Sequence, residues 1–309
     1  MANLKSLKAN ATASVIVYGA PKTGKTLIAG ELAEHFKLIY VGMENGHDTL
    51  FQLPEAWQEN IELVNLPDTR DYPIAIETVL KMVKGPVVIC EAHGKVNCMI
   101  CKRAEAEVIN TNLPALDHNT IVIFDSLTQL TNSAIAHITK GKPDDYKLDY
   151  DDWGNLGKLL DIFLSHLQQA RYNVVVISHE AEVETEGKKK TLVPVGGTRN
   201  FSRNVAKYFG HVVYAERKNK KHVFSCSSTY ATTIMTGSRT AVEVEAMDKP
   251  SLLSIFKPQA SVATAIASAD TKMIASNVAG IKAKSTAPAV KTERASTADI
   301  LARLKAKKA

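Results

Sequence analysis

Gly19-Ala20-Pro21-Lys22-Thr23-Gly24-Lys25-Thr26 lies between a short apolar run, Ser14–Tyr18, and an amphipathic run, Leu27–Glu34. It matches the pattern G-x-x-x-x-G-K-[ST], in which a strand leads into a glycine-rich loop and the loop opens a helix. Glycines let backbone N–H groups approach a polyphosphate closely, and a helix N-terminus faces the phosphates with its positive end. These eight residues therefore predict a nucleotide-binding loop in an α/β protein.

Two residues of this loop and one acid downstream are the expected nucleotide and metal contacts. Lys25 would reach the β- and γ-phosphates, and Thr26 would place its hydroxyl on Mg²⁺. Asp125 ends the apolar run Thr120–Asp125, where a second acid is needed to hold the magnesium water shell. An acid at that place can also cap a helix, but the phosphate loop upstream favours the metal role. No Asn-Lys-x-Asp guanine-reading motif is present, so we expect ATP and Mg²⁺ as cofactors.

Hydrolysis of ATP also needs a group that orients the attacking water. Glu44 follows the second expected strand and is the best candidate, with an ordinary loop carboxylate as the alternative. His179 ends the strand that comes after Asp125, at the place where a sensor of the γ-phosphate would lie. The predicted catalytic residues are Lys25, Glu44, Asp125 and His179.

Apolar runs alternate with helical patterns through the first two-thirds of the chain. Apolar strands separated by helices are typical of a parallel sheet covered on both faces. The expected strands are 14–18, 38–42, 61–65, 120–125 and 173–178, and the expected helices are 27–34, 72–83 and 153–167. After residue 210, short strands are expected at 211–214, 222–225, 242–245 and 252–256, as an antiparallel extension of the same sheet.

The domain boundaries follow from a shift in composition at Pro258. Residues 1–257 are expected to form one ATPase core, which carries no net charge. From Pro258 onward nine Lys or Arg face three Asp or Glu and no aromatic residue occurs, so we expect a flexible linker over 258–295. Residues 296–309 carry a capping-box pattern and a narrow apolar stripe, which fit either a short docking helix or a solvated tail.

The composition excludes several classes of protein. No apolar stretch is long enough for a membrane span, and the N-terminus lacks the apolar core of a signal peptide. Four cysteines, three of them within twelve residues, do not resemble a disulfide framework. We therefore expect a protein of the reducing cytoplasm with no membrane partner.

The clustered cysteines predict a small metal site inside the core, in an insertion over residues 86–104. Cys90, His93, Cys98 and Cys101 provide two close pairs of ligands that can surround one Zn²⁺ tetrahedrally. We expect a closed, structural zinc knuckle rather than a catalytic site. Three free thiols beside a chance histidine are the alternative, although thiols so close together would be liable to oxidation.

Basic side chains gather between Lys188 and Lys221, where ten Lys or Arg stand against one acid, Glu216. Cations can neutralise phosphates while an aromatic ring stacks on an unpaired base, and Phe201 and Tyr208 lie among these cations. A solvated basic loop with core aromatics is the alternative. The predicted contacts to single-stranded DNA are Lys188, Lys189, Lys190, Arg199, Phe201, Arg203 and Lys207.

Together these motifs resemble the RecA-type core ATPases and, within them, the phage nucleotide-binding proteins of the Sak type, which act as single-strand annealing recombinases. The resemblance covers about residues 10–257 and includes Pro194–Phe201, which is similar to the second DNA-binding loop of RecA proteins. Arg217–Lys220 resembles a RecA segment whose basic residues reach the ATP of a neighbouring subunit. The candidates for that role in trans are Arg217, Lys218, Lys220 and Arg239.

The resemblance implies a RecA-like P-loop fold and an ATPase that depends on single-stranded DNA and promotes annealing in phage recombination or replication, in the host cytoplasm. It also implies a homo-oligomer, and the tail would recruit a single-strand-binding or replication protein. A non-catalytic, zinc-containing DNA-binding scaffold is the main alternative. A small-molecule kinase is disfavoured because the basic Gly-Gly loop and the long tail have no evident use in one.

Overall fold

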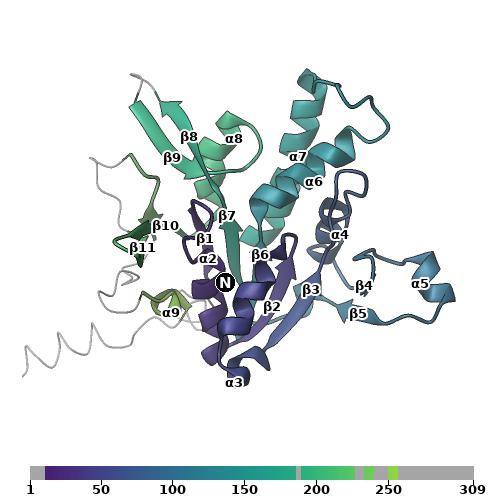
Figure 1. Ribbon diagram of the computed structural model, residues 1–309, viewed down its shortest axis with the longest axis horizontal. Coiled ribbons are helices and arrows are strands. Elements are labelled where there is room, and N and C mark those ends of the chain that lie inside the picture. Colours follow the sequence, from purple (N-terminus) through teal and green to yellow (C-terminus); the bar gives the residue numbers. More distant parts are fainter. Residues whose placement is uncertain (1–10, 186–188, 227–232, 240–249, 257–309) are drawn as a thin grey trace, which may run out of the picture. The chain divides into compact units, whose positions relative to one another are not determined.

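A mainly parallel β-sheet organises the chain in the computed structural model, which describes residues 11–185, 189–226, 233–239 and 250–256 (Figure 1). The strands follow the order β11-β10-β1-β7-β6-β2-β3, and β12 pairs with β10. Their bounds are β1 (Ser14–Gly19), β2 (Lys37–Gly42), β3 (Ile61–Asn65), β6 (Thr120–Asp125), β7 (Asn173–Ser178), β10 (His211–Lys218), β11 (Lys221–Ser225) and β12 (Gly237–Ser238). The five strands expected in the first two-thirds of the chain are therefore all present.

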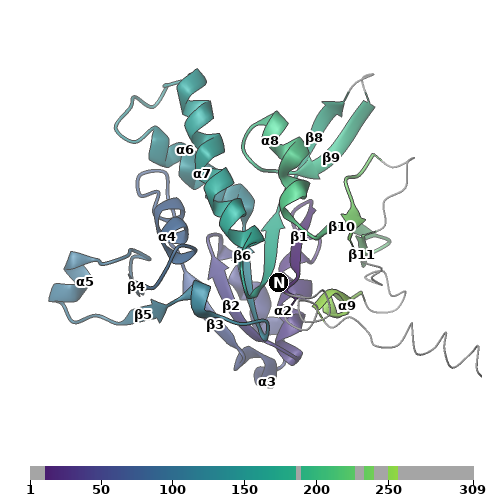
Figure 2. The same ribbon diagram turned by 180° about the vertical axis from the view of Figure 1, so that it is seen from behind.

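Alternate residues of the central strands divide the core into two layers (Figures 1 and 2). Ile16 and Tyr18 of β1 belong to the layer of α4, α6 and α7, whereas Val15 and Val17 belong to the layer of α2, η1 and α9. The helices are α2 (Lys25–Gly30), α3 (Glu55–Gln58), α4 (Ala75–Met82), α6 (Leu127–Ile138), α7 (Tyr150–Gln168), α8 (Arg199–Asn204) and α9 (Leu253–Phe256), with 3-10 turns η1 (Glu31–Glu34), η2 (Asn45–Gln52), η3 (Leu113–Ala115) and η4 (Val205–Tyr208). The predicted α/β architecture with helices on both faces is confirmed.

The C-terminal part of the sheet differs in two ways from the expected antiparallel extension. β10 pairs with β1 in parallel, and only β11 and β12 are antiparallel to it. The run 252–256 was predicted as a strand but forms α9, because Leu252, Ile255 and Phe256 pack at helical spacing against the α2 layer. The expected strand 242–245, the linker and the tail segment 296–309 lie outside the described residues.

Two hairpins extend from the main sheet (Figure 1). The first consists of β4 (Val87–Cys90) and β5 (Val108–Thr111), with α5 (Met99–Arg103) between them; it includes most of the predicted insertion 86–104 but continues to Thr111. The second consists of β8 (Glu180–Thr185) and β9 (Lys189–Pro194), in a region expected to be a loop. Since β8 begins two residues after β7 ends, this second hairpin continues directly from the centre of the sheet.

Candidate functional site

The predicted phosphate loop joins the central strand β1 to α2 and is held tightly on one side. Gly19 has φ 153°, and a Cβ added there would lie 2.0 Å from the carbonyl oxygen of Ala215 in β10. Gly24 has φ 89°, and a Cβ there would meet the His222 ring at 2.9 Å. The His222 Nδ1 lies 2.9 Å from the Thr23 carbonyl oxygen. Glycine is therefore required at both positions, by conformation and by the close approach of β10 and β11.

Lys25 lies buried beneath this loop. Its ammonium donates to the carbonyl oxygens of Gly19 at 2.9 Å and Ala20 at 2.7 Å. Burial lowers the pKa of Lys25, and the negative fields of Asp125 and Glu44 act in the opposite direction. A buried cation among acids and carbonyls can bind the anionic phosphates of a nucleotide once they replace the carbonyl contacts.

Asp125 lies at the end of β6, next to the end of β2, because these strands pair in parallel with Gly42 opposite Asp125. Its Oδ2 accepts hydrogen bonds from the Thr26 hydroxyl at 2.7 Å and from the Tyr40 hydroxyl at 2.6 Å. Burial raises the pKa of Asp125, and these two hydrogen bonds oppose the rise. Thr26 and Asp125, the two predicted magnesium ligands, are therefore in direct contact, and an oxygen pair of this kind suits Mg²⁺.

Tyr40 was missed by the sequence analysis, which treated 38–42 only as an apolar strand. The residue is fully buried, and burial beside Asp125 raises the pKa of its hydroxyl. Gly46 also lies here, since a Cβ added to it would be 3.2 Å from Asp125 Oδ2 and 3.4 Å from the Tyr40 hydroxyl. A tyrosine inside an otherwise aliphatic strand was the available signal, because a buried hydroxyl needs a polar partner.

Glu44 follows β2 and contacts residues from two other strand ends. Its Oε1 accepts a hydrogen bond from the Ser126 hydroxyl, and its Oε2 lies 3.5 Å from His179 Nε2. The hydrogen bond from His179 is the main reason that the pKa of Glu44 is lowered, while burial acts against it. Glu44 is thus held as a carboxylate within the electrostatic reach of Lys25. A carboxylate in this state can accept a proton or orient a water.

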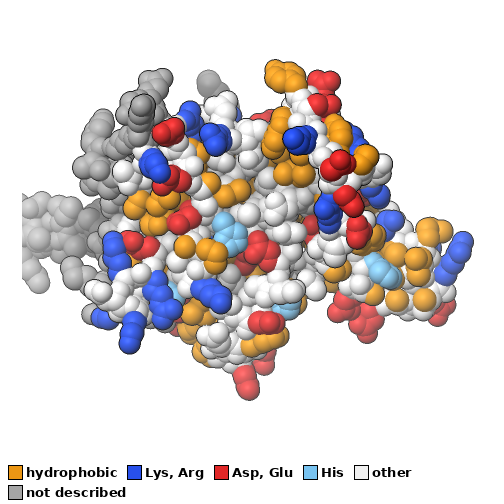
Figure 3. Space-filling model, turned by 45° about the horizontal axis from the view of Figure 1, so that its top comes forward, with side chains coloured by type: hydrophobic (Ala, Val, Ile, Leu, Met, Phe, Trp, Pro, Cys, Tyr) orange, Lys and Arg blue, Asp and Glu red, His pale blue; other side chains and the backbone are white. Residues whose placement is uncertain are grey.

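The four predicted catalytic residues therefore meet at the carboxyl edge of the parallel strands. This edge faces forward in Figure 3, where a histidine and acidic side chains lie beside one another near the middle of the surface, with Lys and Arg side chains toward the lower left. Ligands of open α/β sheets bind at this edge. A comparison with protein families matches residues 11–242 of the chain, about three quarters of its length, to the AAA domain.

This chain belongs to the AAA domain family. Membership implies a P-loop ATPase that binds and hydrolyses nucleotide, and the match spans every residue of the site described above. No curated protein matches the chain. Among the described helices, none combines the length and apolar character that crossing a lipid bilayer requires.

The predicted DNA contacts of this AAA domain protein lie in different environments. Arg199 and Arg203 are exposed on α8, one helical turn apart. Lys190 is also exposed, but its ammonium pairs with Glu182 of β8 at 2.7 Å. Lys207 is exposed, with its ammonium 4.7 Å from the centre of the Tyr208 ring. Lys188 lies outside the described residues, and Lys189 begins β9.

The two aromatic rings of this segment pack inward. Tyr208 is buried, and its hydroxyl donates to Asp161 of α7. Phe201 is half-buried, stacks on Tyr208 with ring centres 6.2 Å apart, and lies under Gly196 of the Gly-Gly loop. Tyr208 is therefore a core aromatic, as the alternative interpretation holds. The role of Phe201 in base stacking stays a prediction.

The candidates for a role in trans lie at opposite ends of β10. Arg217, Lys218 and Lys220 lie at the β10–β11 turn, beside the phosphate loop of their own chain, since Arg217 pairs with the same His222 that reaches Thr23. Arg239 follows β12, and its N–H donates to the Gly210 carbonyl just before β10 begins.

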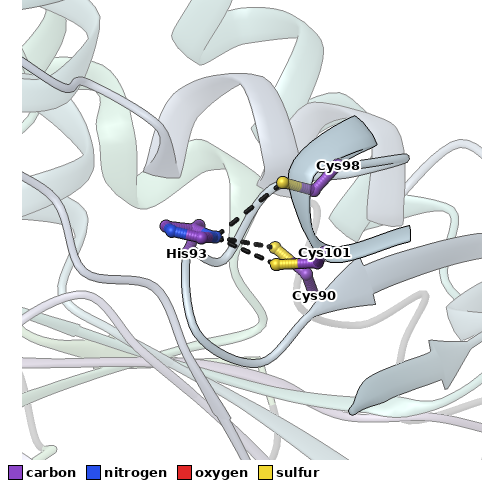
Figure 4. Close-up of side chains that lie close together, drawn as sticks. All are labelled: Cys90, His93, Cys98 and Cys101. Atoms are coloured by element: carbon purple, nitrogen blue, oxygen red, sulfur yellow. Dashed lines mark hydrogen bonds between the residues drawn. The ribbon is translucent and has the colours of Figure 1, made fainter. Parts of the chain in front are cut away.

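The four predicted zinc ligands lie together in the β4–β5 hairpin (Figure 4). One ligand atom from each residue lies within 4.8 Å of all the others, and the residues are Cys90, His93, Cys98 and Cys101. This constellation could hold a metal ion and is separate from the residues around Lys25 and Asp125.

Proposed function

We propose that this AAA domain protein is a Mg²⁺-dependent ATPase whose nucleotide site controls binding of single-stranded DNA, and that it promotes strand annealing in phage recombination or replication. The observation that carries the ATPase proposal is the meeting of Lys25, Asp125, Glu44 and His179 at one sheet edge. The resemblance to Sak-type proteins supports the annealing role. The AAA domain match supports the binding and hydrolysis of nucleotide.

The residues would divide the work of hydrolysis as follows. Lys25 would bind the β- and γ-phosphates, and Thr26 with Asp125 would hold Mg²⁺, which neutralises charge on the phosphates when bound. Glu44 would orient the attacking water after leaving its hydrogen bond with Ser126. His179 would exchange its contact with Glu44 for the γ-phosphate.

The link to DNA rests on the backbone around His179. The His179 carbonyl accepts a hydrogen bond from the Val195 N–H at 2.9 Å, and Val195 begins the Gly-Gly loop that leads into α8. The His179 N–H donates to the Thr128 hydroxyl at 2.9 Å. A shift of His179 on nucleotide binding would therefore move the loop that presents Arg199 and Arg203. This connection supports a nucleotide-controlled DNA segment.

Replacing Arg199 and Arg203 together by alanine should weaken binding of single-stranded DNA without changing ATP binding. Each lost phosphate contact on a single strand should make the slope of log affinity against log salt shallower by about 0.7. Fluorescence anisotropy with a labelled oligothymidine across a salt series measures this slope. Arg171→Ala, which removes an exposed arginine before β7, is the control and should leave the slope unchanged. An unchanged slope in the double variant would remove α8 from the DNA-binding surface.

Replacing Tyr40 by phenylalanine should raise the Mg²⁺ concentration needed for half-maximal turnover by about tenfold, because Asp125 loses one of its two hydrogen bonds. Turnover at saturating Mg²⁺ should change little. Tyr18→Phe is the matched control, since its buried hydroxyl bonds to the carbonyls of Leu192 and Met235 instead. Equal Mg²⁺ requirements in Tyr40→Phe and the wild type would show that Tyr40 does not position Asp125.

A non-catalytic scaffold that binds nucleotide for stability or switching is the second candidate. It is favoured by the protein contacts that already occupy Lys25 and Glu44. ATP turnover with and without single-stranded DNA, measured alongside the mass in solution, separates the two. Turnover that DNA stimulates in a homo-oligomer supports the main proposal, and no turnover in either state supports the scaffold.

A further inference from the structure

The arm formed by β4, α5 and β5 contains a compact set of soft ligands. His93 Nδ1 lies 3.8 Å from Cys90 Sγ, 3.8 Å from Cys98 Sγ and 3.1 Å from Cys101 Sγ. In Figure 4 the three sulfur atoms face the same ring nitrogen. Cys90 ends β4, Cys98 directly precedes α5, and Cys101 lies within α5. All three cysteines are buried and free of disulfide bonds.

These distances fit one tetrahedral ion. With Zn–S near 2.3 Å and Zn–N near 2.0 Å, the ligand atoms of a tetrahedral zinc lie about 3.5–3.8 Å apart. The three observed N–S separations, 3.8, 3.1 and 3.8 Å, lie within about 0.4 Å of the N–S value of such a site, which is about 3.5 Å. Three thiolates and one imidazole fill all four positions, so the chemistry favours a closed structural site.

The part of the arm around α5 has only a small buried cluster of its own. Its own buried cluster consists of Cys90, Cys98 and Cys101, with Ala106 packed against them. Met99 and Ile100 of α5 point to solvent, 61% and 71% exposed, whereas Ile89 of β4 is buried in the main core. A metal bound by the three cysteines would therefore supply a cross-link where the apolar packing of the arm is smallest.

The metal-binding turn packs directly against the ATPase core. Gly94, in the turn between Cys90 and Cys98, has φ 61°, and a Cβ added there would lie 3.0 Å from Pro67 and 3.1 Å from Leu66. The Gly94 carbonyl accepts a buried hydrogen bond from the Thr78 hydroxyl of α4 at 2.8 Å. The turn therefore presses on the loop that follows β3 and on α4 at the same time.

The next residue of that loop, Asp68, connects α4 to α6. Its Oδ1 accepts from the Ala75 N–H at the start of α4 and from the Ser133 hydroxyl of α6, and its Oδ2 accepts from the Gln129 amide. The Gln129 N–H in turn donates to the hydroxyl of Ser126, which holds Glu44. A continuous series of contacts thus runs from the cysteine arm to the proposed catalytic carboxylate.

We propose that Cys90, His93, Cys98 and Cys101 bind one structural Zn²⁺, and that the metal-held turn braces the loop around Asp68 and so positions α6 in the ATPase site. The zinc site itself is independent of the proposed ATPase function. Only the consequence for Glu44 rests on that function.

Metal content tests the first part. Protein purified without added zinc should contain about one Zn²⁺ per chain, and Cys98→Ala or Cys101→Ala should contain less than about 0.2. Cys226→Ala, which removes the buried cysteine outside the arm, is the control and should keep the metal. Substitution of Co²⁺ in the wild type should give the intense visible absorption of a tetrahedral thiolate site. Folded wild-type protein that lacks zinc, or that keeps it after loss of Cys98, overturns the proposal.

Hydrogen exchange tests the brace. In Cys101→Ala, or in wild type depleted by a zinc-selective chelator, amides of residues 66–76 and of the first two turns of α6 should exchange at least about tenfold faster than in zinc-loaded protein. β1 and β7 should keep their protection. Faster exchange confined to residues 90–108 would disprove the brace while leaving the zinc site. A Lys25→Ala variant should keep the wild-type metal content and the wild-type exchange of residues 66–76 and α6, so a failed ATPase proposal cannot be mistaken for a failed zinc proposal.

Discussion

Replacement of Lys25 by alanine is expected to lower ATP turnover by about 10²- to 10³-fold and to weaken nucleotide binding. Lys25 is the buried cation of the phosphate loop, and its field acts on both Asp125 and Glu44. Without it, phosphates would enter a site dominated by carboxylates. Binding of a fluorescent ATP analogue and steady-state release of phosphate measure the two effects.

Lys22 is the matched control for this substitution, because it belongs to the same loop but is exposed. Lys22→Ala should retain turnover within about threefold, since an exposed cation in water contributes little. If both alanine variants bind ATP as well as the wild type does, the phosphate loop does not grip nucleotide in the way inferred. If both lose binding equally, general damage to the loop is the explanation.

Replacement of Glu44 by glutamine should lower turnover by about 10³-fold while ATP affinity stays within about threefold of the wild type. Glutamine keeps the size of the side chain and an oxygen for the Ser126 hydroxyl but cannot accept a proton from the attacking water. The expected signature is therefore a protein that fills with ATP and does not release phosphate. Single-turnover measurements with excess protein separate this outcome from slow product release.

Asp48→Asn provides the comparison for Glu44, since Asp48 lies four residues further on, in η2, with its side chain 74% exposed. It removes one negative charge near the site without touching Ser126 or His179, and turnover should be nearly unchanged. Wild-type turnover in Glu44→Gln would rule out Glu44 as the water-orienting residue. Glu180, the neighbour of His179 whose charge also reaches Lys25, would then be the next residue to replace.

Much of the nucleotide site could be predicted from the sequence because its signals are local. The phosphate loop needs a strand, glycines and a helix within some twenty residues, and all of these are adjacent in the chain. Asp125 ends one apolar strand and His179 directly follows another, so their place at one sheet edge followed from the parallel arrangement. The four zinc ligands were equally visible, since a span of twelve residues contains the whole cluster.

Contacts between distant strands could not be predicted in the same way. Tyr40 meets Asp125 only because β2 lies beside β6, and the spacing of apolar residues does not specify which strands become neighbours. The direction of β10 was missed for the same reason, because His211–Tyr214 is equally apolar in a parallel or an antiparallel pair. The run 252–256 is too short for the spacing of its apolar residues to distinguish a strand from a helix. Its packing against the α2 layer favours the helix.

Pairing between strands also places an acidic side chain beside a cation of the basic stretch 188–221. The stretch around Lys190 seemed almost free of acids, but the β8–β9 pairing brings Glu182 against Lys190. Among the described cations of this stretch, Lys190 and Lys218 each pair with a glutamate, so the cationic surface is narrower than the sequence indicated.

The position of β1 has a consequence for how the protein is made. This strand lies near the N-terminus, yet its two neighbours, β7 and β10, begin at Asn173 and His211. A nascent chain leaving the ribosome must therefore expose the apolar β1 while the more than 150 residues between Gly19 and Asn173 are synthesised, because β7 is the first of its two neighbours to be made. Early translation products should thus be natural clients for chaperones that shield apolar segments, and the nucleotide pocket should be among the last parts of the protein to form.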